Sequence, residues 1–457
     1  MRNQPCLKTI VMVLLRTKKR TSAGNDFSQV EQQKAPKRKL KEFDDEISSG
    51  SEDGDLPPPV KDLPDSSDED ETAQEKKMRL TKKYLEQLQT VHAKDDSDNE
   101  KDVVGDILKE DVLEKAGRLQ RKIADLCVQP SEDNITRLRG HKLSVTCLAV
   151  SASKGVLFTA SKDCSINKWC LNTHKKLFTV KGTKPKPNQK AHSAHVLSLA
   201  LTTDFKFLAS AGKDKIILVW NPDTMEYVHT FRGHRNTISG VAFRLNSTQL
   251  FSSSHDRTVK VWDVGIMSYV ETLYGHQESV EACDSLTRER CVSCGGRDRS
   301  ARIWKIVEES QLVYHGHTGS IDCIRYINEE YMISGSDDGS ICIWSIMKKK
   351  PIVIIRDAHK DEKKNNWISS VAALPNSDLL ATGSSNGLIR LWKCSDKFLQ
   401  LLPLFDISAC GFVNDLRFTD KGNHLIAAIG QEHKLGRWWS IKSARNSTMI
   451  IPLKQNI

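Results

Sequence analysis

The segment that decides the fold runs from Gly233 to Trp262 and reads GHRNTISGVAFRLNSTQLFSSSHDRTVKVW. In it, Asp256 follows His234 after 22 positions, and Trp262 follows Asp256 after six. Short apolar runs alternate with polar turn residues, which is the pattern of β-strands. The strands expected in and just after this segment are Ile238–Phe243, Gln249–Ser253, Thr258–Trp262 and Tyr269–Leu273.

The same spacing returns along the chain with a period of about 40 to 45 residues. Four copies agree to the residue, and a fifth is one residue shorter. The repeated positions are His141, Asp163 and Trp169; His192, Asp214 and Trp220; His234, Asp256 and Trp262; His276, Asp298 and Trp304; and His317, Asp338 and Trp344.

Two further copies are degenerate. The sixth has an insertion and an Asn, and its positions are His359, Asn386 and Trp392. The seventh extends from Phe412 to Trp439, with Ala409 at the histidine position and Glu432 or His433 at the aspartate position. We therefore expect Trp439 to end the third strand of a seventh unit.

This repeat resembles the WD-repeat family, whose members are β-propellers of four-stranded blades. The resemblance implies an all-β, seven-bladed propeller over residues 131–457, in which each Asp accepts a hydrogen bond from the buried His of its own blade. Because each blade buries its faces only against its neighbours, the ring must be closed by a shared outer strand. Two segments compete for that position, Ile135–Leu138 and Met449–Leu453.

The chain before the ring falls into two parts. Residues 1–70 lack hydrophobic periodicity and are rich in charge, Ser and Pro, so we expect a disordered tail. Residues 71–130 form a helical extension with two amphipathic helices, over 71–91 and 106–128, which either lie against the ring or bind a partner.

The tail contains a compact basic cluster, which is either a nuclear import signal or a solvated run of charge. Its members are Lys37, Arg38, Lys39 and Lys41. Acidic, serine-containing blocks follow at 48–53 and 66–71, where phosphorylation would add negative charge.

The composition favours a soluble, intracellular protein with an acidic partner. The 457 residues carry a formal net charge of +10, which suggests nucleic acid. No apolar stretch is long enough to cross a membrane. The twelve cysteines lie mostly in predicted strands, and Cys291 and Cys294 fit a core role better than a metal site, so neither a metal nor a cofactor is expected.

No catalytic site is predicted, because the Ser, His and Asp residues recur in blade after blade, whereas a catalytic site occurs once. The repeat instead predicts a binding surface. The turn that carries each Asp lies on the same face of the ring as the Gly-His loop, and the residues flanking it are basic in blades 1 to 4. The candidate RNA-binding residues are Lys162, Lys213, Lys215, His255, Arg257, Arg297 and Arg299.

Three other features accompany this basic crescent. The loop between the first two blades adds Lys181, Lys184, Lys186 and Lys190 on the same face. The run 348–350 is three lysines in a turn on the opposite face, where solvation is the simplest interpretation. For Trp367, Trp438 and Trp439 we expect core packing.

A second resemblance is more specific. Residues 71–77, 84–88, 108–114, 430–439 and 444–446 are similar to the WD-repeat proteins of the U3 small nucleolar ribonucleoprotein. This resemblance implies a non-catalytic RNA-binding scaffold in the nucleolus, whose partners are the U3 small nucleolar RNA and other proteins of that particle, with no membrane or small-molecule substrate. The alternative is a protein-interaction hub, such as a ubiquitin-ligase substrate receptor or a chromatin adaptor.

Overall fold

The computed structural model describes residues 73–92, 100–184, 190–361 and 364–454. The chain divides into two compact units, residues 1–81 and 82–457. The expected import cluster at 37–41, the acidic blocks and Lys186 lie outside the described residues. In the described ranges, no helix is long and apolar enough to cross a membrane.

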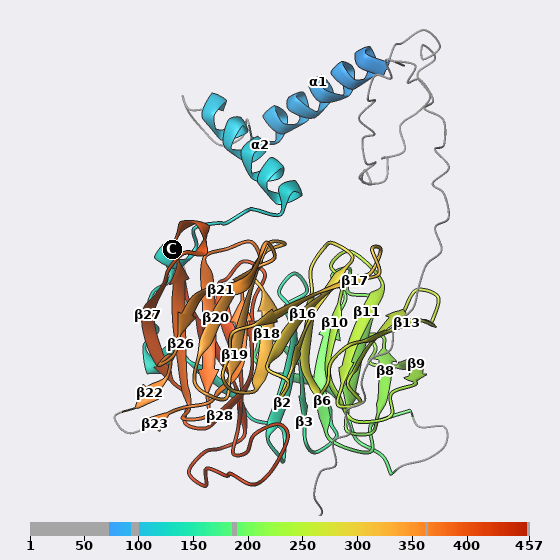
Figure 1. Ribbon diagram of the computed structural model, residues 1–457, viewed down its shortest axis with the longest axis vertical. Coiled ribbons are helices and arrows are strands. Elements are labelled where there is room, and N and C mark those ends of the chain that lie inside the picture. The colour runs from blue at the N-terminus through green and yellow to red at the C-terminus, as the bar shows by residue number, and fades with distance from the viewer. Residues whose placement is uncertain (1–72, 93–99, 185–189, 362–363, 455–457) are drawn as a thin grey trace, which may run out of the picture. The chain divides into compact units, whose positions relative to one another are not determined.

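The described residues of the larger unit form seven four-stranded antiparallel sheets, which are the blades of a propeller (Figure 1). The innermost strands of blades 1 to 7 are β2 (Val145–Ser151), β6 (Val196–Leu201), β10 (Ile238–Phe243), β14 (Val280–Ser285), β18 (Ile321–Tyr326), β24 (Ile368–Ala373) and β28 (Phe412–Phe418). These inner strands contact one another in chain order, and β28 contacts β2, so the ring is closed.

The other three strands of each blade follow outward. The second strands are β3 (Val156–Ser161), β7 (Leu208–Gly212), β11 (Gln249–Ser254), β15 (Arg290–Gly295), β19 (Tyr331–Ser336), β25 (Leu379–Ser384) and β29 (His424–Gly430). The third strands are β4 (Ile166–Cys170), β8 (Ile216–Trp220), β12 (Thr258–Asp263), β16 (Ser300–Lys305), β20 (Ile341–Ser345), β26 (Leu388–Cys394) and β30 (Ser447–Pro452). The outer strands are β5 (Lys176–Val180), β9 (Tyr227–Arg232), β13 (Ser268–Tyr274), β17 (Ser310–His315), β21 (Lys348–Ile355), β27 (Leu401–Ser408) and β1 (Thr136–Leu138).

Burial follows strand position because neighbouring blades cover both faces of the middle strands. Every residue of β7 and β8 is buried, whereas the first three residues of β5 are exposed. A small hairpin, β22 (Lys360–Asp361) with β23 (Lys364–Asn365), extends the connection between blades 5 and 6. The four strands expected from the opening segment are confirmed, each to within one residue at either end.

Both segments that competed to close the ring take part in closure. β30 is the third strand of blade 7, and β1 from the start of the ring pairs antiparallel with it as the fourth strand. In the register, Thr136 pairs with Ile450 and Leu138 with Thr448. The chain therefore closes through a sheet built from both ends of the propeller.

The expected end of blade 7 at Trp439 was wrong. After β29 the chain forms a long connection, residues 431–446, and the third strand begins only at Ser447. Trp438 is 69% exposed and Trp439 is 39% exposed, so the expected core packing does not occur there. Trp367 is half-buried, and its ring lies 4.1 Å from that of His433, which has 1% exposure.

The described helices are α1 (Ala73–His92) and α2 (Glu100–Ala116). The first agrees with expectation, whereas the second ends twelve residues before the predicted end at 128. Residues 117–128 instead cross the turns between first and second strands. Arg118 pairs with Glu330 at 2.8 Å, the amide of Ala124 donates to Asp378 at 3.0 Å, and that of Val128 donates to the carbonyl of Leu453 at 2.8 Å. Competing contacts with the ring therefore overcome local helical propensity.

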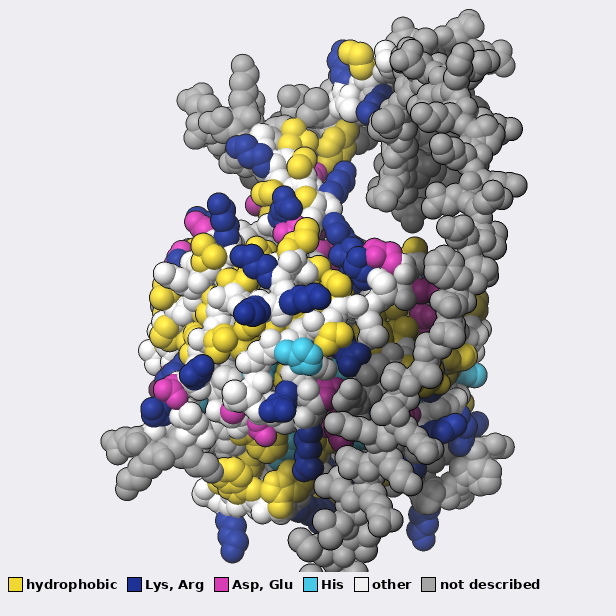
Figure 2. Space-filling model, viewed as in Figure 1, with side chains coloured by type: hydrophobic (Ala, Val, Ile, Leu, Met, Phe, Trp, Pro, Cys, Tyr) yellow, Lys and Arg dark blue, Asp and Glu magenta, His cyan; other side chains and the backbone are white. Residues whose placement is uncertain are grey.

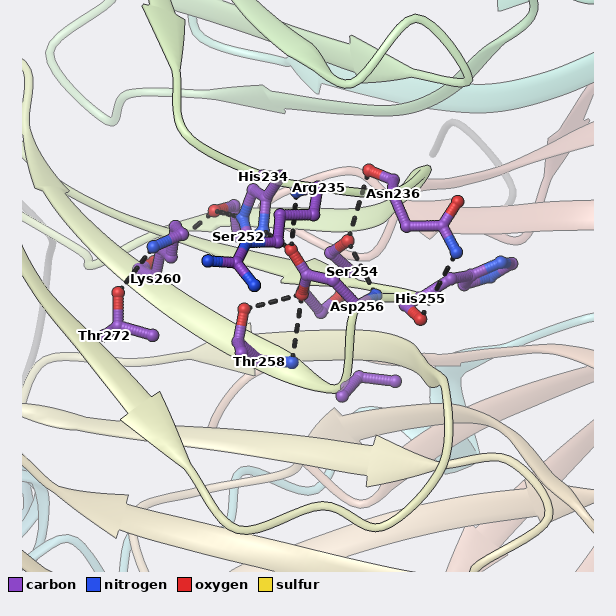
Figure 3. Close-up of polar contacts among 12 residues, drawn as sticks. His234, Arg235, Asn236, Ser252, Ser254, His255, Asp256, Thr258, Lys260 and Thr272 are labelled. Atoms are coloured by element: carbon purple, nitrogen blue, oxygen red, sulfur yellow. Dashed lines mark hydrogen bonds and ion pairs between the residues drawn. The ribbon is translucent and has the colours of Figure 1, made fainter.

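A buried polar chain organises the blades, and blade 3 shows it most clearly (Figure 3). Trp262 Nε1 donates to Ser252 Oγ at 2.8 Å. Ser252 Oγ lies 2.7 Å from His234 Nε2, and His234 Nδ1 lies 2.8 Å from Asp256 Oδ2. Asp256 also accepts from the amide of Arg235 and from Thr258. Every link satisfies a group that would otherwise be buried without a partner.

The chain recurs around the ring with variations. The direct His–Asp contact measures 3.4, 2.7, 2.8 and 2.7 Å in blades 1 to 4. Blade 5 departs from expectation, because His317 bonds to Ser340 while Asp338 accepts from Thr318 and the amide of Gly319. The hydroxyl that bridges His and Trp was not identified from the sequence, although a Ser or Thr precedes the Trp by ten or eleven positions. These hydroxyls are Thr159, Ser210, Ser252, Ser293, Ser334 and Thr382.

Removal of the Asp256 carboxylate tests this organisation. Burial raises the pKa of Asp256, but hydrogen bonds from His234 and Thr258 outweigh it and hold the pKa well below its ordinary value. Asp256→Ala should destabilise the protein by roughly 1–3 kcal/mol, because the buried His and two turn amides lose their acceptor. Urea unfolding would measure this effect, with the exposed Asp420→Ala as control; equal midpoints for the two variants would contradict it.

Candidate nucleic-acid interface

The turns that carry the aspartates define one face of the propeller, which we call the Asp-turn face. It also bears the connections between blades, including the β22–β23 hairpin, and the 431–446 connection within blade 7, which lie along the lower edge in Figure 1. The 117–128 segment and the turns it crosses lie on the opposite face, because successive antiparallel turns alternate between the two ends of a sheet.

The residue after each aspartate, or after the Asn of blade 6, has a positive φ. The angles are 64° at Cys164, 66° at Lys215, 70° at Arg257, 54° at Arg299, 80° at Gly339 and 82° at Gly387. Glycine adopts this left-handed conformation freely, whereas other L-residues are destabilised there by roughly 1–2 kcal/mol. Blades 5 and 6 use glycine, but blades 2, 3 and 4 place a basic residue in the same strained position. In these three successive blades, a positively charged side chain therefore stands where the backbone favours glycine.

Five of the seven predicted RNA-binding residues are exposed on this face. They are Lys213, Lys215, Arg257, Arg297 and Arg299, in blades 2 to 4. Among these five side chains, only that of Arg299 has a described hydrogen bond, from its guanidinium to the carbonyl of Thr318 at 3.5 Å. In the adjoining connection, Lys181, Lys184 and Lys190 are also exposed. The structure thus presents a row of cations on consecutive blades.

Lys162 and His255 do not project to solvent as expected. The Lys162 side chain is 2% exposed, and its ammonium group contacts Glu432 at 3.1 Å and donates to the carbonyl of Gly436 at 2.8 Å. Burial lowers the pKa of Lys162, partly offset by Glu432. His255 lies 3.2 Å from Glu281 and its side chain is 23% exposed. Both groups are therefore occupied in contacts within the protein.

Two exposed cations were missed. Lys142 and Arg235 immediately follow the histidines of blades 1 and 3, and their backbone amides donate to Asp163 and Asp256. Both residues lie just before the first strands of their blades, in loops on the Asp-turn face. The signal in the sequence was the position after each Gly-His, which is basic in the first and third copies.

Basic side chains are not confined to this face. In Figure 2, Lys and Arg project from the lower edge and are also scattered over the visible side. Residues 348–350 are exposed at the start of β21, next to a turn of the opposite face. The Asp-turn face is therefore distinguished by the repeated, backbone-constrained placement of its cations, and the three lysines serve as a reference.

The inner strands carry a second regular feature. Each has a β-bulge near its start on this face, at Thr146, Leu197, Ser239, Glu281, Asp322, Ser369 and Asn414. Four of these side chains donate to a backbone carbonyl of the next inner strand, as Thr146 does to Val196 at 2.7 Å. The bulges thus link each of these blades to its neighbour.

Blades 4 and 5 differ because their bulged residues are buried acids. Glu281 is held by His255 and by Ser279, whose hydroxyl donates to it at 2.7 Å, whereas Asp322 accepts from the indole N–H of Trp367. Burial and the neighbouring Glu281 raise the pKa of Asp322 to about 7. Burial also raises the pKa of Glu281, but the contact with His255 outweighs it and lowers the pKa.

Metal-binding residues do not cluster in the described part of the chain, where no group of three or more His, Cys, Asp or Glu could hold an ion. Cys291 and Cys294 are both fully buried in β15. Burial raises the pKa of each thiol, and for Cys291 the contact with Cys283 adds to the effect. Their position is that of core side chains.

Comparison with known proteins gives consistent matches. The WD domain, G-beta repeat family matches residues 132–170, 183–221, 225–263, 267–305, 308–345 and 351–393. The chain is 55% identical over 397 residues to the U3 small nucleolar RNA-interacting protein 2 of Mus musculus, covering 84% of this chain and 83% of that protein. It is 29% identical to the ribosomal RNA-processing protein 9 of Saccharomyces cerevisiae, covering 92% and 98% of the two chains.

A solved structure of the RRP9 WD40 repeats is also similar. It superposes with a TM-score of 0.69 and 52% sequence identity, and the match covers 72% of this chain and 100% of that one. The similarity therefore extends over the whole of that solved propeller.

The buried acids give a pH-dependent prediction. Because folding raises the pKa of Asp322, the folded state binds the proton more tightly than the unfolded chain, and stability should fall as pH rises from about 4 towards 7. Asp322→Asn removes the charge but keeps an acceptor for Trp367. The variant should therefore raise the thermal midpoint at pH 8, with a smaller gain at pH 5.

Glu281→Gln is the matched control and should behave in the opposite way. Since folding lowers the pKa of Glu281, its charged form stabilises the protein above the pKa of the unfolded chain, and the substitution should lower the midpoint at pH 8. Differential scanning calorimetry at both pH values measures the two effects. A lower midpoint for Asp322→Asn at pH 8 would contradict the assignment.

Proposed function

The chain belongs to the WD-repeat family, within the group of U3 small nucleolar RNA-interacting proteins, and from this premise we propose that it is a non-catalytic RNA-binding scaffold. The scaffold acts in a U3 small nucleolar ribonucleoprotein during processing of pre-ribosomal RNA and formation of the small ribosomal subunit. The names of its relatives support the particle and the process. The Asp-turn face supports the binding activity.

The observation that carries the proposal is the left-handed position after the aspartate in blades 2 to 4. Lys215, Arg257 and Arg299 occupy a backbone conformation that favours glycine, and the equivalent turns of blades 5 and 6 contain glycine. A polyanion that follows the ring would meet one cation in each of three successive turns. Arginine suits this contact because its planar guanidinium grips phosphate through two hydrogen bonds or stacks on an unpaired base.

The proposed RNA surface consists of the exposed members of the crescent, namely Lys213, Lys215, Arg257, Arg297 and Arg299. Lys142 and Arg235 extend it towards the connections between blades. Lys162 contributes indirectly, since its ion pair with Glu432 ties blade 1 to the 431–446 connection. Other proteins of the particle would occupy the remaining surface, which is the scaffolding part of the function.

The test replaces Lys215, Arg257 and Arg299 by glycine, the residue found in blades 5 and 6. Thermal stability should be unchanged or higher, because the substitution relieves backbone strain. Binding to the U3 small nucleolar RNA should weaken, and the slope of log affinity against log salt should flatten by about 0.7 for each lost single-strand phosphate contact. Titrations at several salt concentrations measure both quantities.

The control variant carries alanine at positions 348, 349 and 350 on the opposite face, where three positive charges are removed as well. Its affinity and salt slope should remain near those of the wild type. If the control loses RNA binding and the glycine variant does not, the RNA lies on the other face of the propeller.

A nucleolar location follows from the proposed function, and the basic cluster at 37–41 is the candidate import signal. Neutralising Lys37, Arg38, Lys39 and Lys41 should shift the protein to the cytoplasm, since import receptors read compact basic clusters. Fluorescence imaging of a tagged chain measures the distribution. Full nucleolar retention of the variant would place the signal in the propeller or in a partner that carries it.

A further inference from the structure

The connection between β29 and β30, residues 431–446, is the part of the Asp-turn face that the repeat does not explain. In blade 3 the corresponding turn is only residues 255–257. The longer connection is nevertheless built into the structure. The amide of Glu432 donates to Ser144 at 3.1 Å, and the amide of Lys434 donates to Asn414 at 2.9 Å.

Two neighbouring blades fix the first half of this connection. Lys162 of blade 1 binds both Glu432 and the carbonyl of Gly436. On the other side, the buried His433 ring packs against Trp367, which precedes the first strand of blade 6. Within the connection, the amide of Ile441 donates to the carbonyl of Gln431 at 2.9 Å. The segment between these anchors is therefore held in a defined shape.

The anchored segment presents an indole to solvent. Trp438 is 69% exposed, and its ring packs directly on Gly436, where an added Cβ would collide with it. Its ring centroid is 6.2 Å from that of His433. Trp439 packs at its edge against Phe412 at 5.5 Å. One face of a large aromatic ring is thus supported by the protein while much of the indole remains accessible.

Positive charge predominates in the connection that carries this indole. Between 431 and 446 the chain has four basic residues and a single acid, Glu432, which is already shared by Lys162 and Arg437. Arg437, Lys442 and Arg445 are exposed. A packed but accessible aromatic ring in a segment with several exposed cations has the chemistry of a site for an unpaired nucleotide, because a base can stack on the ring and the phosphates can meet the cations.

We infer that the 431–446 connection binds a single-stranded RNA segment, with one unpaired base stacked on Trp438 and its phosphates held by Arg437, Lys442 or Arg445. This inference rests on the proposed function and deepens it. The crescent of blades 2 to 4 binds phosphates through charge, whereas this site adds a preference for unpaired nucleotides. Charge favours RNA over an apolar protein partner, since an exposed Trp alone would suit either.

The experiment compares the full-length wild type with Trp438→Ala, using oligouridylate and a fully paired RNA hairpin as probes. Loss of one base stack should weaken oligouridylate binding about 5- to 150-fold, with the salt slope unchanged, because stacking releases no counterions. Hairpin binding should change little. Trp438→Phe should keep part of the affinity, and wild-type tryptophan fluorescence should fall on binding by an amount that Trp438→Phe lacks.

Met347→Ala is the control, since Met347 is also exposed, at 78%, in the turn before β21 on the opposite face. Thermal midpoints of all variants show whether the propeller is intact.

If Trp438→Ala binds both probes like the wild type while the glycine variant of the crescent does not, the inference is wrong and the proposed function stands. If the wild type binds neither these probes nor the U3 small nucleolar RNA, the proposed function itself fails. Unchanged RNA affinity together with loss of a protein partner would assign Trp438 to a protein contact and overturn the inference.

Discussion

In blades 2 to 4, the basic surface depends on one interaction, the hydrogen bond between a buried histidine and the aspartate of the adjacent turn. An imidazole inside a blade requires partners for both nitrogens, and the turn supplies one of them. The same carboxylate accepts from turn amides, so the backbone on either side of Asp256 has little freedom. The following residue is held in a left-handed conformation with its side chain outside the turn. The need of the buried histidine for a hydrogen-bond partner thereby fixes the position of the exposed side chain that follows the aspartate.

The blades share one strand arrangement, but the turn between their second and third strands carries different residues around the ring. Blades 2 to 4 use the constrained position for cations, blades 5 and 6 leave it as glycine, and blade 7 replaces the turn by an anchored connection with an exposed indole. Glu281 and Asp322 add buried acid beneath blades 4 and 5. The charge on the Asp-turn face therefore differs from blade to blade. A chain of phosphates that follows the ring would meet different side chains at each blade.

The blades could be predicted from the sequence because the residues that define a blade lie close together in the chain and recur. A His, an Asp and a Trp at fixed spacing define one blade without reference to any other, and the strands of blade 3 follow directly. Predictions were wrong where contacts with a segment distant in the sequence decide the burial or the conformation of a residue. Lys162 is buried by a connection some 270 positions later in the chain, and 117–128 leaves the helix because Asp378 and Leu453 offer backbone partners. Trp439 resembled the end of a strand because a Trp marks that position in the other blades, but closure of the ring uses β30 instead.

Closure by β1 and β30 has a consequence for synthesis of the protein. β1 is the first strand of the propeller to leave the ribosome, whereas its partner at residues 447–452 is the last. Until then blade 7 lacks its third strand, and the first blade has no neighbour on one side. The 431–446 connection that buries Lys162 is also among the last segments made. Premature termination or C-terminal damage thus yields an open ring with unpaired edges, which quality-control proteases and chaperones recognise, so only complete chains acquire the assembled face.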